Sequence, residues 1–306
     1  MKTSLQKKQD YSESKNFIRK KIGTWFLNHP NLWTNSLSPY SIYRGLTGKQ
    51  RILPNFIIIG VPKCGTTALY EYLIQHENVL SALWKEIYFF DRYYPRGLDW
   101  YRANFPYKLT KFFKETKNKS SFLTGESTPT YIHHPLAPNR IANDIPDVKL
   151  IILLRNPVDR AYSHYQMEKR LGYENLEFSE ALDQEDQRLK NENMKMVNDS
   201  NYYSYEWQTH SYKHSGHYAE LLTKWMKFFP KENLLILKTE EFNENPSQVF
   251  HQVLNFLDLP MQDVKYNKIN VGKYSHMDPK IRDKLYEYFK PHNEKLYKLL
   301  DRNFNW

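Results

Sequence analysis

The sequence has a single cysteine, Cys64, among 306 residues, so it excludes an internal disulfide and fits a reducing compartment. It has no apolar run long enough to cross a membrane, and no apolar segment of a secretory signal near its start. It also has no internal repeat and no low-complexity tract. These absences predict a cytoplasmic protein without a transmembrane segment, with peripheral attachment to a membrane surface as an alternative.

Acidic residues are outnumbered, since 34 Asp and Glu stand against 44 Lys and Arg and the net charge is +10. This excess favours acidic ligands such as phosphates, sulfated glycans or an anionic membrane, although a basic surface without a ligand explains it equally well. Apolar residues make up 40% and aromatic residues 16% of the chain, which is enough for a large core. We expect an N-terminal extension over residues 1–50 and one domain over residues 51–306.

The segment Gly60–Thr67 predicts an anion-binding turn. It follows the apolar run Phe56–Ile59, precedes a helical pattern, and contains a lysine and two threonines. Free backbone N–H groups and the dipole at the start of a helix attract negative charge. A buried strand, a turn and a helix start in this order therefore indicate a site for a phosphorylated nucleotide.

Two features of an ATP-binding loop are missing. The pattern G-x-x-x-x-G-K-[ST] has lysine after its second glycine, but this chain has Thr66 there and its lysine lies earlier, as Lys63. The later apolar run Leu150–Leu154 is followed by Arg155 and not by the aspartate that would hold a metal ion. A cation in that place predicts that the protein itself neutralises the phosphate, in a reaction that needs no metal.

Four near-continuous apolar runs have the character of buried parallel strands: Phe56–Ile59, Phe122–Gly125, Leu150–Leu154 and Leu234–Leu237. Helical patterns lie between or after them: Thr66–Gln75, Val158–Leu171, Tyr218–Phe229, Ser247–Leu257 and Asp278–Leu300. Pro291 is expected to break or kink the last of these. The alternation predicts a P-loop-like α/β fold in three layers, with a central, mostly parallel sheet between helices. Ligands of such sheets bind at the carboxyl ends of the strands, which Lys63, Glu126 and Arg155 follow.

The motif Gly-Val-Pro-Lys-Cys-Gly-Thr-Thr at Gly60–Thr67 resembles the 5′-phosphosulfate loop of sulfotransferases that use 3′-phosphoadenosine 5′-phosphosulfate (PAPS). Arg155–Tyr165 is similar to their 3′-phosphate motif, and Lys85–Asp91 and Gly272-Lys273 add to the resemblance. It covers about residues 53 to 306 and is strongest for the heparan sulfate sulfotransferase type and its prokaryotic relatives. It implies a PAPS-dependent sulfotransferase that releases adenosine 3′,5′-bisphosphate and takes no metal.

The resemblance assigns a donor site to the positions that match the family's motifs. Arg155 and Ser163 would bind the 3′-phosphate. The 5′-phosphosulfate would be bound by Lys63, Cys64, Gly65, Thr66 and Thr67. Lys63 would also stabilise the charge that grows on the bridging oxygen as the sulfuryl group leaves. Gly272 and Lys273 would lie in a loop that closes over the donor, where this chain has one cation and the family often has two.

Glu86 matches the glutamate that acts as the catalytic base in the heparan sulfate type, where it accepts the proton of the acceptor hydroxyl. A glutamate that merely pairs with Lys85 is the alternative. Ser127 stands where glycosaminoglycan-modifying members commonly have lysine, which argues against a heparan-like acceptor and leaves Glu126 to orient the hydroxyl. We expect four aromatic residues to line the cleft: Trp84, Tyr88, Phe89 and Phe90.

We therefore predict in-line transfer of a sulfuryl group from PAPS to a hydroxyl, or less readily an amine, of a carbohydrate, lipid or small-molecule acceptor. Nucleic acid is not expected as a partner, and the sequence does not indicate an oligomeric state. Two other functions stay open: a P-loop nucleotide kinase, and a non-catalytic basic module that binds acidic glycans. His210, His214 and His217 form a loose cluster, but no further ligand at metal-binding spacing accompanies them.

Overall fold

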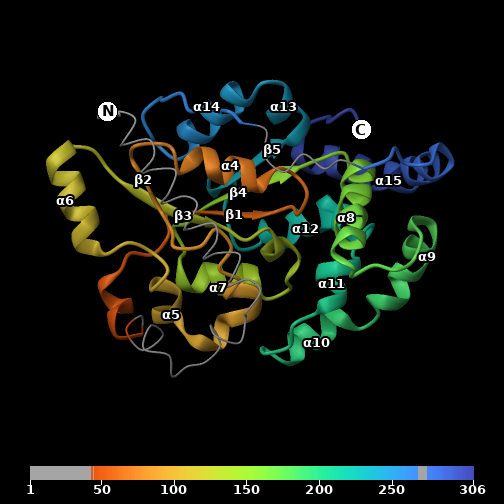
Figure 1. Ribbon diagram of the computed structural model, residues 1–306, viewed down its shortest axis with the longest axis horizontal. Coiled ribbons are helices and arrows are strands. Elements are labelled where there is room, and N and C mark those ends of the chain that lie inside the picture. The colour runs from red at the N-terminus through yellow and green to blue at the C-terminus, as the bar shows by residue number, and fades with distance from the viewer. Residues whose placement is uncertain (1–42, 44, 268–273) are drawn as a thin grey trace, which may run out of the picture.

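The computed structural model describes residues 43, 45–267 and 274–306 (Figure 1). Its five strands are parallel and form one sheet in the order β2-β3-β1-β4-β5. Their bounds are β1 Phe56–Gly60, β2 Val79–Ser81, β3 Leu123–Ser127, β4 Lys149–Leu154 and β5 Leu234–Lys238. The sheet confirms the predicted α/β fold, and all four predicted strands are present with their ends shifted by at most two residues.

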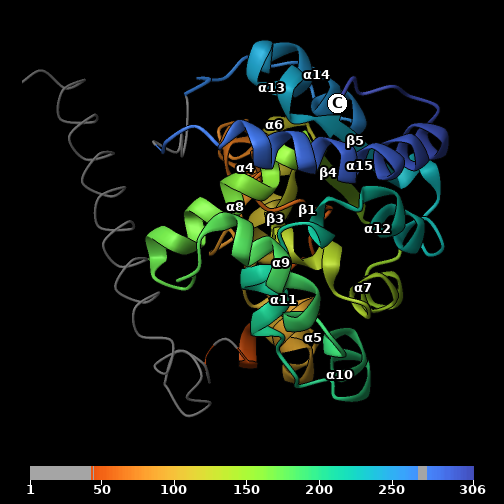
Figure 2. The same ribbon diagram turned by 90° about the vertical axis from the view of Figure 1, so that its right-hand side faces the viewer.

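Helices cover both faces of the sheet. Figures 1 and 2 show α4, α13 and α14 on one side of it and α5 and α7 on the other. The α-helices are α4 Thr66–Leu73, α5 Leu98–Arg102, α6 Lys108–Asn118, α7 Ala137–Asp144, α8 Pro157–Leu171, α9 Phe178–Arg188, α10 Glu192–Asn198, α11 Tyr205–His210, α12 Tyr218–Trp225, α13 Thr239–Glu244, α14 Pro246–Phe256 and α15 Pro279–Leu300. Shorter helical turns are η1 Gly48–Gln50, η2 Phe89–Tyr93, η3 Tyr94–Arg96, η4 Pro129–His133, η5 His214–Gly216 and η6 Lys231–Asn233.

The main core is built on the two central strands. Residues 56–59 of β1 and 150–154 of β4 have no exposed surface, as expected for strands that are covered on both faces. A second, smaller core joins α8, α9 and α15, in which Tyr165, Phe178 and Phe289 pack together. Because α8 follows β4 directly, this second core fixes the helix that carries the motif Arg155–Tyr165.

Pro291 does not break the last helix, so of the two predicted outcomes, a break or a kink, the break is wrong. α15 runs through it from Pro279 to Leu300. Proline removes the N–H that would bond to the carbonyl of Glu287, but both residues are exposed, so water can solvate that carbonyl. Leu285, Phe289 and Leu296 are buried on the helix, and their packing offsets the missing hydrogen bond.

Residues 1–42 lie outside the described residues, so the expected division at residue 50 stays a prediction. Within the described ranges, every helix falls short of the length and apolarity that a membrane crossing requires.

Candidate active site

The turn between β1 and α4 lies at the carboxyl end of a central strand. Gly65 has a φ of 91°, a left-handed conformation that glycine adopts at little cost, and it is the N-cap of α4 without a side-chain hydrogen bond. Lys63 also has a positive φ, 73°, which is uncommon for a residue with a side chain. The turn thus leaves the first N–H groups of α4 without a side-chain acceptor, as an anion site requires.

Lys63 carries a positive charge in the turn, and the carboxylate of Glu168 on α8 is near enough to raise its pKa. Its Nζ lies 3.4 Å from Sδ of Met167 on α8, and it takes part in no ion pair with a residue of the described ranges. Burial lowers the pKa of Lys63, and the positive charges of Arg170 and Arg155 lower it further. A bound anion would counteract these electrostatic effects, so this arrangement suits a negatively charged ligand.

Arg155 reaches the same turn from the end of β4. Its Nη1 donates a hydrogen bond of 3.3 Å to the carbonyl oxygen of Lys63. The hydroxyl of Tyr218 donates to the carbonyl oxygen of Arg155 at 2.7 Å and so fixes the backbone at this point. The structure therefore brings together the two cations that the sequence placed at the ends of β1 and β4.

α8 starts directly after Arg155. Its N-cap, Asn156, accepts a hydrogen bond from a backbone N–H of the first turn, which stabilises the helix start. Ser163 lies in the second turn and is 6% exposed. Met167, one turn further along, contacts Lys63, so the face of α8 that carries Ser163 is turned towards the anion-binding turn.

Glu86 is linked to this turn through Lys85. Nζ of Lys85 donates to Oγ1 of Thr67 at 2.7 Å and also forms a short ion pair with Glu86. The Glu86 carboxylate accepts a second hydrogen bond, from the hydroxyl of Tyr88. The side chains of Lys85 and Glu86 are 22% and 28% exposed, so a ligand can reach them. The ion pair of Glu86 with Lys85, which was the alternative to a catalytic role of Glu86, is therefore present, and it lies beside the turn.

Glu126 does not face a cleft, which corrects the expectation that it orients an acceptor hydroxyl. Its side chain is fully buried and accepts hydrogen bonds from the hydroxyls of Tyr101 at 2.8 Å, of Tyr131 at 3.0 Å and of Thr128. Burial raises the pKa of Glu126 to about 7, although these hydroxyls act in the opposite direction. The sequence did not reveal that Glu126 is buried, because glutamate is rarely found fully buried in proteins.

Thr128 connects the buried Glu126 with the segment around Glu86. Its Oγ1 donates to Glu126 and accepts hydrogen bonds from the N–H of Ile87 at 3.0 Å and of Tyr88 at 3.3 Å. Glu126 is therefore a positioning residue, since it orients the hydroxyl that holds the backbone next to Glu86. Its neighbour Ser127 is fully buried, and the Oγ of Ser127 has no hydrogen-bond partner among the described residues.

The remaining predicted residues differ in what they offer to a ligand. Cys64 is fully buried, its N–H donates to the carbonyl of Val61 at 3.2 Å, and burial raises the pKa of its thiol to about 11. It thus fills space as a neutral thiol. Thr66 is 4% exposed. Gly272 and Lys273 lie outside the described residues, and their role stays a prediction.

Phe89 and Phe90 belong to the core and not to a cleft wall, contrary to the expectation. Both are fully buried, and their rings pack against each other with centroids 4.8 Å apart. Trp84 and Tyr88 are partly exposed. All four residues are aromatic, so the sequence alone does not show which of them are buried in the core and which are partly exposed.

Two buried charged residues of α8 were not predicted. Glu168 is 5% exposed, its carboxylate lies 3.4 Å from Nε2 of His164, and burial raises its pKa to about 7. Arg160 is fully buried, and its Nε and Nη1 have no partner within the part of the chain that the structure describes. Its charge lowers the pKa of Cys64, which shows that it adds positive potential behind the turn. In the sequence, only their position on the helix that follows Arg155 indicated that Arg160 and Glu168 lie near the site.

Comparison with known proteins places the chain in a family. The profile of the sulfotransferase domain family matches residues 53–277. A membrane-associated sulfotransferase of Dictyostelium discoideum is 31% identical, over 85% of this chain and 68% of that protein. A heparan sulfate glucosamine 3-O-sulfotransferase of Homo sapiens is 30% identical, over 89% of this chain and 69% of that protein. A bifunctional heparan sulfate N-deacetylase/N-sulfotransferase of Caenorhabditis elegans is 28% identical, but the match spans 33% of that protein.

A solved structure supports the same assignment. The crystal structure of a sulfotransferase from Alicyclobacillus acidocaldarius matches with a TM-score of 0.62 and 28% identity, over 83% of this chain and 98% of that one. The residues matched by the family profile include the anion-binding turn, Glu86 and the motif that begins at Arg155. The chain belongs to the sulfotransferase domain family and is a sulfotransferase, as the sequence predicted.

Proposed function

We propose that the protein transfers a sulfuryl group from PAPS to an acceptor hydroxyl without a metal ion. The contact between Arg155 and the turn at Lys63 carries this proposal. Two cations from different strand ends lie at one edge of the sheet, and neither forms an ion pair with a carboxylate of the described residues. A nucleotide with phosphate groups at its 3′ and 5′ positions suits two such cations, whereas a nucleoside triphosphate needs a lysine together with a metal ion.

The donor would span the distance between these two groups. Lys63, Thr66 and Thr67 would bind the 5′-phosphosulfate together with the N–H groups at the start of α4. Arg155 would bind the 3′-phosphate with its planar guanidinium, and Ser163 on the adjoining helix would donate a further hydrogen bond. Gly65 permits the close approach of the backbone, and Gly272 and Lys273 would cover the bound donor.

The reaction is a single displacement at sulfur. The acceptor oxygen forms a bond to sulfur while the bond from sulfur to the bridging oxygen breaks, and adenosine 3′,5′-bisphosphate leaves with the electron pair. Glu86 takes the proton of the acceptor hydroxyl, and Lys63 offsets the charge on the leaving oxygen. Lys85 and Tyr88 bind the Glu86 carboxylate in the free protein, so the acceptor hydroxyl competes with them for the carboxylate oxygens.

The acceptor class that we propose is a hydroxyl of a carbohydrate, with a lipid or small-molecule hydroxyl and an amine as alternatives. Relatives named for their action on heparan sulfate favour a carbohydrate. The buried Ser127 in place of lysine argues against a highly sulfated polymer, because this position offers no cation. Incubation with ³⁵S-labelled PAPS and fractionated carbohydrate, lipid and metabolite pools would identify the class.

Calorimetric titration separates this function from its rivals. We expect adenosine 3′,5′-bisphosphate to bind more tightly than ATP with Mg²⁺, and EDTA to leave both its binding and sulfate transfer unchanged. Tighter binding of ATP with Mg²⁺ would instead support a nucleotide kinase. If the protein were a basic module that merely binds glycans, no acceptor pool would become labelled with [³⁵S]sulfate.

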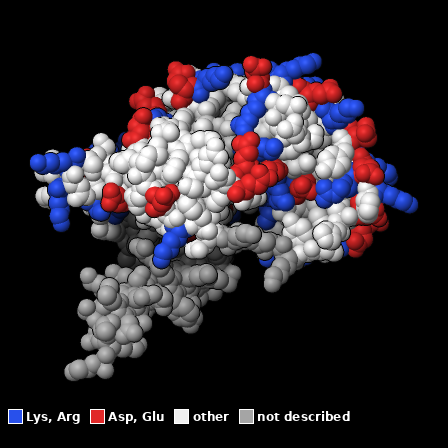
Figure 3. All heavy atoms as spheres, turned by 90° about the horizontal axis from the view of Figure 1, so that it is seen from above, with Lys and Arg blue, Asp and Glu red and all other residues white. Residues whose placement is uncertain are grey.

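We also propose that the protein works in the cytoplasm at the surface of an anionic membrane, and α6 supports this location. Leu109, Phe112 and Phe113 are 61%, 61% and 62% exposed and share one face of the helix, and α6 has no buried residue. Figure 3 shows Lys and Arg side chains beside uncharged surface at the end of the molecule where α6 lies. α6 and its end carry five lysines: Lys108, Lys111, Lys114, Lys117 and Lys119. Exposed aromatic residues among lysines are typical of helices that lie on anionic bilayers.

A further inference from the structure

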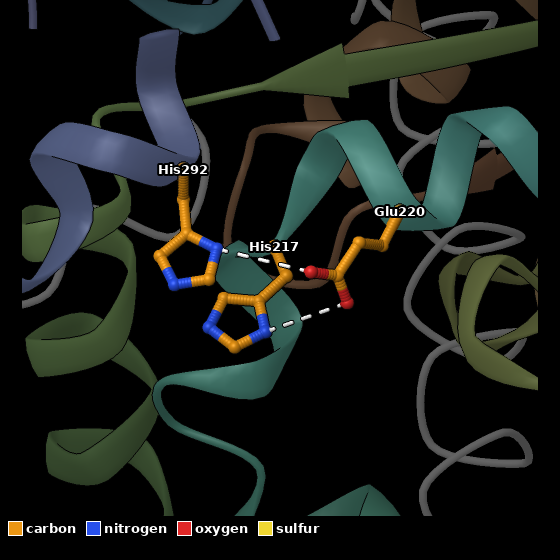
Figure 4. Close-up of side chains that lie close together, drawn as sticks. All are labelled: His217, Glu220 and His292. Atoms are coloured by element: carbon orange, nitrogen blue, oxygen red, sulfur yellow. Dashed lines mark ion pairs between the residues drawn. The ribbon is translucent and has the colours of Figure 1, made fainter. Parts of the chain in front are cut away.

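Two histidines and a glutamate converge where α12 meets α15 (Figure 4). His217 is the N-cap of α12, Glu220 lies in the first turn of that helix, and His292 lies on α15. Each offers one ligand atom, and these atoms all lie within 4.8 Å of one another. The side chains are 11%, 55% and 20% exposed, so an ion from the solvent can reach them.

The distances between these atoms are too long for hydrogen bonds. Nδ1 of His217 lies 3.9 Å from Oε2 of Glu220, and Nδ1 of His292 lies 3.9 Å from Oε1 of the same carboxylate. Ligand atoms that bind one tetrahedral zinc ion at about 2.1 Å are about 3.4 Å apart. Binding one ion therefore requires the half-exposed glutamate to rotate, and it also requires one imidazole ring to turn, because an ion lies in the plane of each ring that binds it and the two planes are now 4° from parallel.

A hydrogen bond of its second nitrogen already holds the imidazole ring of His217. Nε2 of His217 lies within hydrogen-bond distance of the Tyr288 hydroxyl, at 2.9 Å. The rings of His217 and His292 stack with centroids 3.9 Å apart and planes 4° from parallel. Metal-binding histidines usually have their second nitrogen in such a hydrogen bond, because it fixes the ring and leaves the first nitrogen for the ion. Figure 4 shows that both Nδ1 atoms face Glu220.

We propose that His217, Glu220 and His292 bind one zinc ion, or another divalent ion that prefers imidazole, with water as the fourth ligand. The ion would link α12 with α15, and this role does not rest on the proposed donor or acceptor. Both helices support the donor site, because Tyr218 next to His217 holds the carbonyl of Arg155 at 2.7 Å and α15 packs on α8. We therefore assign the site a stabilising role.

Full-length protein, stripped with EDTA and dialysed, tests the site by titration with ZnCl₂. We expect saturable binding, and a midpoint of thermal unfolding that rises by about 5 °C when Zn²⁺ is at roughly 100 times its Kd. Glu220→Gln and His292→Ala should each weaken binding about 10-fold or more. His251→Ala is the matched control: His251 lies 3.2 Å from Asp263, a pair with no third ligand among the described residues, and its loss should leave Zn²⁺ binding unchanged.

A flat titration would overturn the site, as would equal Zn²⁺ affinity in the wild type and Glu220→Gln. Glutamine keeps the shape of a half-exposed glutamate, so this variant should fold even if His292→Ala does not. Co²⁺ bound to the wild type should show the visible absorption of a four-coordinate site, and Glu220→Gln should weaken it. None of these measurements uses sulfate transfer, so their failure would leave the proposed function untouched.

Discussion

At the scale of single residues, the side chain that follows β4 carries our proposal about which nucleotide the protein binds. Arg155 stands there as a cation and donates to the carbonyl of Lys63 at 3.3 Å. A carboxylate in this place would bind a metal ion and would repel a phosphate. We therefore expect Arg155 to favour a doubly phosphorylated adenosine over a nucleoside triphosphate.

Arg155→Ala should therefore weaken the binding of adenosine 3′,5′-bisphosphate. A hydrogen bond from a charged donor contributes about 1.5–3 kcal/mol, so we expect Kd to rise about 10- to 100-fold in calorimetric titration. Arg302→Ala is the matched control, because Arg302 pairs at 2.8 Å with Glu241 in a partly exposed ion pair. Equal affinity of the two variants would contradict the role of Arg155.

Glu86→Gln should leave donor binding intact and slow catalysis. Loss of a general base lowers kcat by about 10²- to 10⁴-fold, which steady-state transfer of [³⁵S]sulfate would measure. Glu232→Gln, at an exposed glutamate of η6, should behave as the wild type. If Glu168→Gln lost turnover and Glu86→Gln kept it, the buried carboxyl on α8 would be the base and our assignment would be wrong.

At the scale of elements, β3 holds the segment around Glu86 through a buried carboxyl. Glu126 binds Thr128, and Thr128 binds the backbone N–H groups of Ile87 and Tyr88. Its folded-state pKa of about 7 lies above the usual value of 4.5. The native state therefore keeps a proton that the unfolded chain releases between these two values, and the free energy of unfolding falls as pH rises through this range.

Glu126→Gln should remove this dependence on pH. We expect the stability of the wild type relative to the variant to fall by about 2–3 kcal/mol between pH 5 and pH 8, because glutamine does not titrate. Urea unfolding of both proteins at the two pH values would measure it. A difference that does not change with pH would show that Glu126 is ionised in the folded protein.

The exposed face of α6 makes a prediction about membranes. Phe112→Ser with Phe113→Ser should abolish co-sedimentation with phosphatidylglycerol vesicles, because two exposed aromatic side chains supply much of the apolar area that enters a bilayer. The wild type should bind these vesicles and not those of phosphatidylcholine. Met261→Ser, at a residue 53% exposed elsewhere, is the control and should bind like the wild type. Unchanged binding of the double variant would exclude α6 as the membrane contact.

The elements that could be predicted from the sequence are those with a strong, repeated signal. β1 and β4 are buried on both faces, so they form continuous apolar runs. β2 has three residues and carries no such run, and it was missed. Pro291 was expected to break or kink α15, and the helix continues through it because tertiary packing outweighs the local preference against proline. The burial of Glu126 depends on hydroxyls far along the chain, such as Tyr101, and no local pattern encodes it.

At the scale of the whole molecule, the order of strands explains the site. β1 lies between β3 and β4, so the segments after these three strands meet at one edge of the sheet. The sequence placed Lys63 and Arg155 there because both follow apolar runs. It did not reveal Glu168 or Arg160, because α8 brings them close to the turn only through its packing.

A crystal structure with adenosine 3′,5′-bisphosphate tests the central claim most directly. We expect the 5′-phosphate to lie in the turn Gly60–Thr67 within hydrogen-bond distance of Lys63, and the 3′-phosphate to contact the guanidinium of Arg155 and the hydroxyl of Ser163. A nucleotide bound with its 3′-phosphate away from Arg155, or at another edge of the sheet, would contradict the account.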